Sequence, residues 1–251
     1  MHALTRRASR NRHSLFLAEG PQSVREAVRH RPDLVRDVYV TPEAGERYAS
    51  VLADAAAAGL RLSAVSTEVL AAMADAQTPQ GLLAVCRFPS ATLAEVLAAR
   101  PRLLSVLVQV RDPGNAGTVV RAADAAGADA VIVTEASVDI YAPKVVRSSA
   151  GSIFHLPVVS GVPAVRAADE IRMAGLRLLA ADGSGERLLS DVDLRGPHAW
   201  FFGNEAWGLP DEDRVRWDEV VRIPIYGQAE SLNLAMAATV CLYASASAAP
   251  H

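Results

Sequence analysis

The sequence predicts an α/β protein with a mainly parallel sheet in its second half, preceded by a smaller α/β region. In the second half, short apolar segments alternate with segments of helical spacing, the pattern of a parallel sheet with helices on both faces. The first such segment, Leu103–Val110, is almost continuously apolar, as in strands buried on both faces. Of the 251 residues, 51% are hydrophobic and 21% charged, so we expect a globular rather than a disordered chain.

The first half, roughly 14–88, alternates short elements. We expect helices at Gln22–His30, Arg47–Ala58 and Thr67–Ala74, and strands at Asp37–Val40, Leu62–Ser66 and Gly81–Phe88. Gly59 suits the position just after a helix, because glycine adopts the left-handed conformation easily. A segment with prolines at both ends, 89–101, predicts a linker that contains the helix Leu93–Ala99. The predicted domains are therefore 1–88 and 102–251.

The second half continues the alternation to near the end of the chain. After Leu103–Val110 we expect strands at Ala130–Thr134, Val158–Val159, Leu176–Ala181, Trp200–Phe202 and Val220–Ile225. Helices are expected at Ala116–Ala126, Lys144–Ile153, Ala164–Ala174 and Leu232–Ala246. Such sheets bind ligands at the carboxyl ends of their strands, so the loops that follow the strands are the candidates for a site.

Several classes of protein are excluded or disfavoured. No apolar run reaches the roughly 18 residues of a membrane span, and no secretory signal follows the basic start, so we expect a cytoplasmic protein without a membrane partner. Cys86 and Cys241 lie in apolar stretches without metal-ligand spacing, which indicates buried thiols and no metal. Dinucleotide, P-loop and GxSxG motifs are absent, and His155 and His198 are interpreted as strand-end residues without a catalytic part.

The charge distribution is asymmetric although the net charge is only −3. Residues 1–36 carry eight arginines against three acidic residues, so this end is +5 and the rest of the chain is −8. Arginine forks match phosphate oxygens, so a phosphate-rich partner is one interpretation. A helix with a solvated basic face is the equal alternative.

Three loops after predicted strands are unusually polar. They are Arg111–Gly117 (RDPGNAG), Gly203–Pro210 (GNEAWGLP) and Pro224–Asn233 (PIYGQAESLN). Taken singly, their polar residues are ordinary turn and cap residues: Asn115 suits the cap of one helix and Ser231 the cap of another. Their common position after strands is what favours a shared site.

Together, the three loops resemble the three signature motifs of the SpoU/TrmH branch of the SPOUT RNA methyltransferases. The first motif corresponds to Asn115, Gly117, Arg121 and 127–130, the second to 202–205 with Gly208-Leu209, and the third to 223–225, Gly227 and 231–233. The match spans about 102–245 in order. The front half is similar, more weakly, to the small α/β RNA-binding domain that precedes many members.

The resemblance implies a fold and a cofactor. Members of the family fold this region around a deep trefoil knot, form homodimers with the active site beside the dimer interface, and bind S-adenosylmethionine mostly through backbone groups. Those backbone positions correspond to Gly203, Ile223 and Leu232. Glycine at 203 is expected to allow close approach of the chain to the ligand.

The resemblance also implies a reaction, methyl transfer to a ribose 2′-hydroxyl. Arg121 matches the key catalytic arginine, and we expect it to clamp the adjacent phosphate and the 2′-oxygen rather than act as a base, because its pKa is too high. The other matching polar positions, expected to orient arginine, ribose and cofactor, are Asn115, Glu205, Ser231 and Asn233. For Glu205 the alternative is a local salt bridge.

Three functions stay open from the sequence. The first is a methyltransferase acting on ribosomal RNA or, alternatively, on transfer RNA. The second is a catalytically silent RNA-binding protein of the same fold, which the intact polar positions argue against. The third is a small-molecule α/β enzyme, which leaves the basic front end unexplained.

Overall fold

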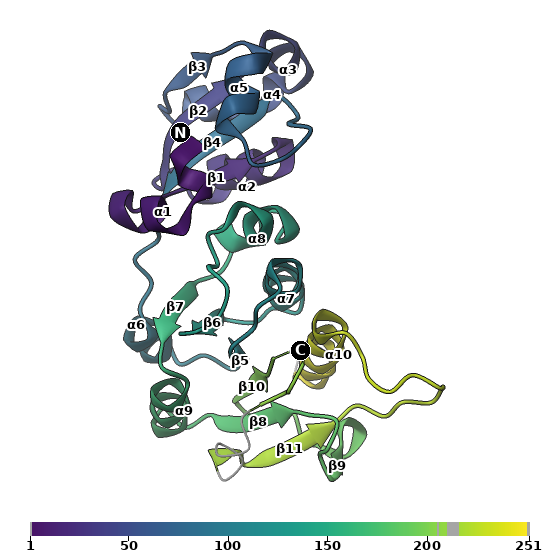
Figure 1. The fold of residues 1–251 in the computed structure, drawn as a ribbon. Coiled ribbons are helices and arrows are strands. Elements are labelled where there is room, and N and C mark those ends of the chain that lie inside the picture. The colour runs from purple at the N-terminus through teal and green to yellow at the C-terminus, as the bar shows by residue number, and fades with distance from the viewer. Residues whose placement is uncertain (1, 205, 210–215, 250–251) are drawn as a thin grey trace. The chain divides into compact units, whose positions relative to one another are not determined.

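The computed structural model describes residues 2–204, 206–209 and 216–249. These residues form two compact units (Figure 1). The first contains residues 1–90 together with 139–155, and the second contains 91–138 and 156–251. The chain therefore leaves the first unit, enters the second, and returns once before completing the second unit.

The first unit is built on a four-stranded mixed sheet in the order β1-β4-β2-β3. Its strands are β1 Leu15–Glu19, β2 Val35–Val40, β3 Leu62–Ala64 and β4 Leu82–Arg87. Its helices are α1 Arg7–His13, α2 Pro21–His30, α3 Pro42–Arg47, α4 Ala49–Ala57, α5 Thr67–Met73 and α8 Pro143–Ser148, with short 3-10 turns at His2–Thr5 and Ser152–Phe154. β4 is antiparallel to both β1 and β2, and β2 is parallel to β3.

The segment 139–155 packs into the first unit through aromatic and charged contacts. The ring of Phe16 in β1 lies 5.0 Å from that of Tyr141 and 5.9 Å from that of Phe154, between centroids. Arg10, only 3% exposed, forms an ion pair of 2.6 Å with Asp139. This segment differs from the predicted division, which assigned all of 102–251 to one domain, because its apolar side chains are covered by β1 and α2 rather than by the parallel sheet.

The second unit contains a seven-stranded sheet in the order β7-β6-β5-β10-β8-β11-β9, and every pairing in it is parallel. Its strands are β5 Leu103–Leu107, β6 Ala130–Thr134, β7 Val158–Val162, β8 Arg177–Ala181, β9 Arg187–Leu188, β10 His198–Phe202 and β11 Glu219–Arg222. Its helices are α6 Leu93–Ala98, α7 Pro113–Ala125, α9 Ala164–Met173 and α10 Leu234–Ala248, with a 3-10 turn at Leu189–Asp191. The parallel sheet predicted from the sequence is confirmed.

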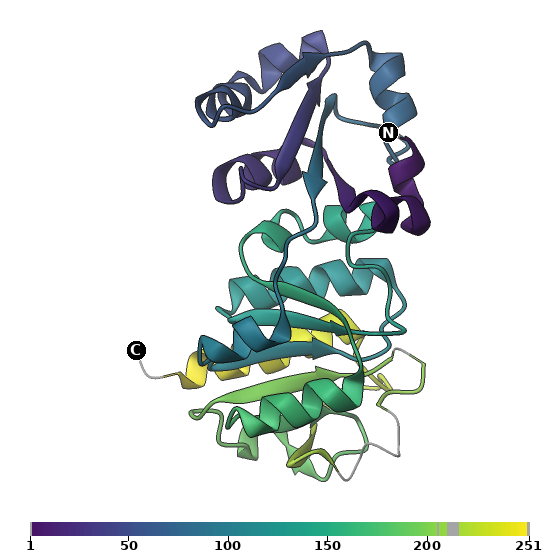
Figure 2. The same ribbon diagram turned by 90° about the vertical axis from the view of Figure 1, so that its left-hand side faces the viewer.

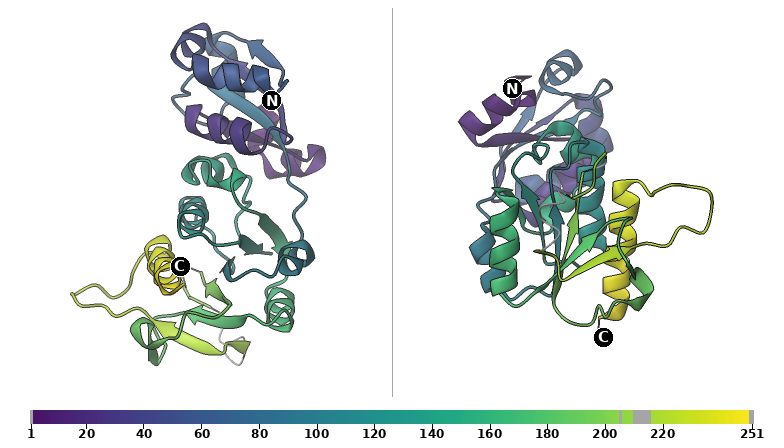
Figure 3. Two further views of the ribbon diagram at one scale, coloured as in Figure 1. Left: turned by 180° about the vertical axis from the view of Figure 1, so that it is seen from behind. Right: turned by 60° about the horizontal axis from the view of Figure 1, so that its bottom comes forward.

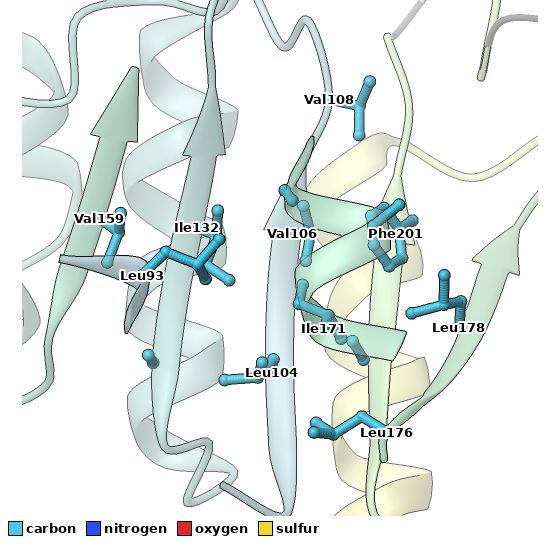
Figure 4. Packing of buried hydrophobic residues seen from close by; sticks show 14 of the residues in the cluster. Leu93, Leu104, Val106, Val108, Ile132, Val159, Ile171, Leu176, Leu178 and Phe201 are labelled. Carbon is cyan, nitrogen blue, oxygen red and sulfur yellow. The ribbon is translucent and has the colours of Figure 1, made fainter. Parts of the chain in front are cut away.

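Helices cover both faces of this sheet. α6 and α9 lie on one face, and α7 and α10 pack against each other on the opposite face (Figures 1 and 2). Alternate strand residues point to the first face, where Val106, Ile132 and Phe201 pack against Leu93 of α6 and Ile171 of α9 (Figure 4). Burial on both faces explains why the strands read as continuous apolar runs.

Most predicted elements are present, with differences where the backbone takes left-handed conformations. The predicted helix Lys144–Ile153 is α8 followed by a separate 3-10 turn, because Ala150 and Gly151 have φ of 50° and 98°. The strand expected to reach Val110 ends at Leu107, and Gln109 has φ of 53°. Strand β1 was missed by the sequence analysis.

The two cysteines are buried free thiols, as expected, and burial raises the pKa of both. Among the described residues, no helix combines the length and apolarity that crossing a membrane requires.

Candidate functional site

A pocket of about 1130 Å³ opens at the carboxyl ends of four neighbouring strands of the second unit, β5, β10, β8 and β11. Residues from the loops after these strands line it. They are Arg111, Asp112 and Asn115; Asp182 and Gly183; Gly203, Asn204 and 206–208; and Ile223, Ile225 and 230–234. The three polar loops singled out in the sequence therefore meet at one pocket, where ligands bind in such sheets.

The loop after β10 is a tight turn held by backbone and side-chain bonds. Asn204 and Gly208 exchange two backbone hydrogen bonds of 2.8 and 2.9 Å. The amide nitrogen of the buried Asn204 side chain donates to the carbonyl of Gln109, and its oxygen accepts from the N–H of Ala206, both at 2.8 Å. A Cβ at Gly203 would overlap the carbonyl group of Gly208. Glycine is thus required at 203 because the backbone of Gly208 lies against it. The reason expected from the sequence was a close approach to a ligand.

Two helix N-termini meet at the pocket, those of α7 and α10. The Asn233 amide nitrogen donates to Asn115 Oδ1 at 3.0 Å, and its own oxygen accepts from the N–H of Ala235 at 2.8 Å. Asp112 caps α7 by accepting from the N–H of Asn115 at 2.8 Å. The caps are therefore Asp112 and Asn233, so the cap roles considered for Asn115 and Ser231 do not apply.

The segment that connects β11 to α10 forms the outer wall of the pocket and projects as a long loop (Figure 3, left). Ile223, Ser231 and Leu232 all line the pocket from this segment. Ile225 and Leu232 leave 37% and 40% of their surface exposed. Exposed apolar side chains that face a pocket are suited to cover an apolar part of a ligand.

One predicted site residue lies elsewhere, and another is not described by the structure. Arg121 is exposed on α7 and does not line the pocket. It lies six positions after Asn115, about 9 Å further along the helix axis at 1.5 Å per residue. Across the described ranges, no hydrogen bond or ion pair to Arg121 occurs, which leaves its guanidinium available to a ligand. Glu205 lies outside the described residues.

Sequence reasoning missed several pocket residues. Asp182 directly follows β8, and Glu230 precedes Ser231 in the outer loop; both bring carboxylates to the wall of the pocket. Trp207 is 53% exposed, and the guanidinium of Arg111 lies 4.8 Å from the centre of its ring. The signal that could have found Asp182 is its place directly after an apolar strand.

The opposite end of β10 carries a buried polar network instead of a site. His198 is fully buried, with Nδ1 2.7 Å from the carbonyl of Gly196 and Nε2 2.7 Å from the hydroxyl of Ser245 in α10. The indole N–H of Trp200 donates to the same hydroxyl at 2.8 Å. Burial lowers the pKa of His198, so the neutral imidazole joins α10 to the sheet.

Comparison with known proteins assigns the chain. A model of the SpoU rRNA methylase family matches residues 102–243, which is more than half of the sequence. The chain belongs to the SpoU rRNA methylase family. A second model, described as the substrate-binding domain of RNA 2′-O ribose methyltransferases, matches residues 17–92.

Similar SpoU relatives cover nearly the whole chain. The 23S rRNA (guanosine(2553)-2′-O)-methyltransferase RlmP of Bacillus subtilis is 35% identical over 93% of this chain and 89% of its own length. The SpoU methyltransferase AviRb from Streptomyces viridochromogenes, solved in complex with AdoMet, has a TM-score of 0.84 and 32% identity, covering 98% of this chain and 94% of its own. An AdoMet-bound rRNA methyltransferase from Sinorhizobium meliloti has a TM-score of 0.84 at 28% identity, over 97% and 91%.

The SpoU family match divides between the units in an informative way. Every residue that lines the pocket falls within 102–243, the methylase match. The substrate-binding match, 17–92, covers the four strands of the first unit except the start of β1. The segment 139–155 lies inside the methylase match but packs in the first unit.

Proposed function

We propose that this SpoU methylase transfers a methyl group from S-adenosylmethionine to a ribose 2′-hydroxyl in ribosomal RNA. The proposal rests on the meeting of the three signature loops in one pocket, in a chain of which 93% matches an rRNA ribose methyltransferase. Transfer RNA is the alternative substrate.

The residues that line the pocket fit the cofactor. Ile223, Ile225 and Leu232 offer apolar surface and backbone groups for an adenine ring. Asp182 and Glu230 offer negative charge to a cationic sulfonium and amino group. The volume of about 1130 Å³ lies at the upper end of small-molecule pockets and leaves room for a ribose beside the cofactor. When bound, S-adenosylmethionine supplies an electrophilic methyl group.

The side chains of the chain would orient the reaction rather than enter it covalently. Asn115 and Asn233 form one hydrogen-bonded pair at the pocket, so each fixes the amide orientation of the other. Ser231, in the outer loop, offers a hydroxyl to the ribose or to the cofactor carboxylate. Glu205 is proposed to orient the arginine or the ribose.

Arg121 is proposed to bind the RNA backbone next to the target ribose and to stabilise the negative charge that develops on the 2′-oxygen. Its exposure and the lack of an ion pair within the described part of the chain support a role toward an external anion. Its position outside the pocket wall means that the RNA strand must run from α7 to the pocket mouth. A guanidinium keeps its proton, so it acts as a donor of hydrogen bonds.

The first unit is proposed to bind the RNA substrate through α1. Five of the eight arginines in residues 1–36 form ion pairs with acidic residues, namely Arg10, Arg25, Arg29, Arg31 and Arg36. The remaining three are exposed at or beside α1, and we call them the α1 arginines: Arg6, Arg7 and Arg12. Exposed arginines on one short segment, with no ion pair to them among the described residues, suit contacts to consecutive phosphates.

A homodimer is proposed on the surface of α10. Met236, Val240 and Tyr243 are 54%, 41% and 49% exposed, and their spacing of four and three residues places them on one face of the helix. An exposed apolar stripe of this kind indicates a protein interface. Met236→Glu with Val240→Glu should give monomers in light scattering, whereas Met173→Glu, at an exposed methionine of α9, should not. A wild-type monomer at micromolar concentration would contradict the dimer.

The trefoil knot and the cytoplasmic location are also proposals. The insertion of β10 between β5 and β8, followed by the return of α10 onto α7, supports a threaded chain. An experimental structure in which joining the two ends of the backbone gives an unknotted loop would refute the knot. Ribosomal RNA as substrate supports a cytoplasmic protein, which fractionation of cells would test.

The function is tested with labelled S-adenosylmethionine. We expect transfer of the labelled methyl group to naked 23S rRNA, alkali-resistant linkage at the modified nucleotide, and cofactor binding that EDTA leaves unchanged. Transfer to tRNA alone would favour the alternative substrate. Binding of RNA without any transfer would indicate the silent RNA-binding protein, and folded protein that binds neither cofactor nor RNA would overturn the proposal.

A further inference from the structure

Three potential metal ligands, none of which lines the methylase pocket, converge in the first unit. Glu26 and His30 lie one turn apart on α2, and His155 follows the 3-10 turn Ser152–Phe154. His30 Nε2 lies 3.4 Å and His155 Nε2 lies 3.2 Å from the same atom, Glu26 Oε2. One donor atom from each of the three residues lies within 4.8 Å of the other two.

The separations match a tetrahedral zinc site. With zinc–nitrogen and zinc–oxygen bonds of about 2.0–2.1 Å, two ligand atoms of a tetrahedron lie about 3.3–3.4 Å apart. Both measured separations to Glu26 Oε2 agree with this edge. The imidazole of His30 is half exposed, at 51%, so its ring has room to reorient around an ion.

The fold builds this cluster with specific supports. A Cβ at Gly151 would lie 2.7 Å from the Cβ of Glu26 and closer still to its Cγ, so glycine is required where Glu26 packs against the chain. Gly151 also has φ of 98°, which directs the chain into the turn that ends at His155. Arg25 Nε donates to Glu26 Oε1 at 2.8 Å, which orients the carboxylate and leaves Oε2 toward the two imidazoles.

The two imidazole rings lie next to each other, with their centres 4.4 Å apart. Two imidazole nitrogens and one carboxylate oxygen are ligands suited to a divalent cation, and imidazole nitrogen favours zinc over magnesium or calcium. A hydrogen-bonded carboxylate oriented by a neighbour is typical of metal sites.

We propose that Glu26, His30 and His155 bind one zinc ion, with solvent in the fourth position. The ion links α2 to the end of the segment 139–155 and so fastens that segment within the first unit. It is distinct from the methylase pocket, whose lining residues include none of the three. The proposal does not depend on the reaction that the protein catalyses.

The test uses the full chain without a polyhistidine tag, treated with chelator and then titrated with zinc chloride alone in a calorimeter. We expect one zinc per chain with a Kd of about 1 μM or tighter, and a rise in Tm of about 5 °C at saturating zinc, because a ligand that binds only the folded state stabilises it. Cobalt(II) should give the intense visible absorption of a tetrahedral site.

Matched variants assign the ligands. His30→Gln and His155→Gln should each weaken zinc binding by at least about 10-fold and abolish the rise in Tm, with unchanged circular dichroism. His13→Gln, at an exposed histidine of α1 in the same unit, should bind zinc as the wild type does. Binding of S-adenosylmethionine should be the same with and without zinc. Zinc affinity weaker than about 100 μM, or affinity unaffected by both ligand substitutions, would overturn the proposal.

Discussion

Replacement of Arg121 by alanine separates a catalytic arginine from a solvated one. The side chain is exposed, and no ion pair or hydrogen bond holds it within the described ranges of the chain. Its removal should therefore change the free energy of unfolding by no more than about 0.5 kcal/mol. If it stabilises charge on the 2′-oxygen, however, turnover should fall by about 100-fold or more, equivalent to about 2.7 kcal/mol in the activation free energy.

The geometry also predicts what should not change. Arg121 does not line the pocket, and it lies about 9 Å along α7 from Asn115, which does. Binding of S-adenosylmethionine should thus be nearly the same in Arg121→Ala as in the wild type. Arg121→Lys should restore little activity, because an ammonium ion cannot reproduce the planar fork that binds phosphate.

The assay is single-turnover methylation of rRNA with excess enzyme, alongside calorimetry with the cofactor and urea unfolding. Arg166→Ala is the matched control, since Arg166 is also an exposed helix arginine of the second unit, 69% exposed, and pairs with Glu170 one turn away. The control should retain full methylation. If Arg121→Ala keeps most of the wild-type rate, or loses cofactor binding in proportion to activity, the proposed role is wrong.

Three further predictions follow from contacts described above. Asn233→Ala should lower the unfolding free energy by about 1 kcal/mol through loss of the α10 cap. Asn233→Asp keeps the cap but loses the hydrogen bond to Asn115, so it should weaken only cofactor binding. If calorimetry shows wild-type cofactor affinity in Asn233→Asp, Asn233 does not belong to the site. Burial lowers the pKa of His198 below its unfolded value of about 6.5, so its contribution to stability is present above pH 6.5 and is lost as pH falls below it. Between pH 7.5 and 5, urea unfolding should show a smaller loss of unfolding free energy in His198→Gln than in the wild type. An equal loss in the two proteins would refute the assignment. Alanine at all three α1 arginines should weaken RNA binding and leave cofactor binding unchanged. The slope of the logarithm of the RNA association constant against the logarithm of salt concentration should fall in magnitude by up to about 3. An unchanged slope in filter binding would exclude α1 from the RNA contact.

Much of the second unit was predictable because its strands are buried on both faces. The run Ala130–Thr134 has the bounds expected from its apolar residues alone. The loops that follow such strands were identifiable by polar composition, and three of them do line one pocket. Local pattern is sufficient here because strand, loop and helix follow each other along the chain.

The first unit was less predictable because it is not continuous in sequence. Tyr141 and Phe154 read as parts of the second half, yet they stack around Phe16 in β1. Removing residues 1–88 would leave these side chains without their cover, so surface substitutions test RNA binding more cleanly than that deletion. The spacing of hydrophobic residues in the sequence does not predict which of the two sheets will bury a given aromatic side chain.

The site shows the same division between local and tertiary information. Asn115 and Asn233 were selected singly from sequence, but only the fold joins them in a hydrogen bond across 118 positions. The motif match selected Arg121 without showing that it would lie outside the pocket wall. Glu26, His30 and His155 escaped notice because no metal-ligand spacing connects the third residue to the first two.

The divided first unit has a consequence for synthesis on the ribosome. Domains generally fold from the amino end as the chain emerges, at about 5–20 residues per second. Here the four strands of the first sheet are complete by Arg87, but α8, which packs against β1, arrives only with 139–155. For several seconds the nascent chain must therefore hold Phe16 without Tyr141 and Phe154 while β5, α7 and β6 emerge. Ribosome-nascent chains stalled before and after residue 155 should differ in protease resistance.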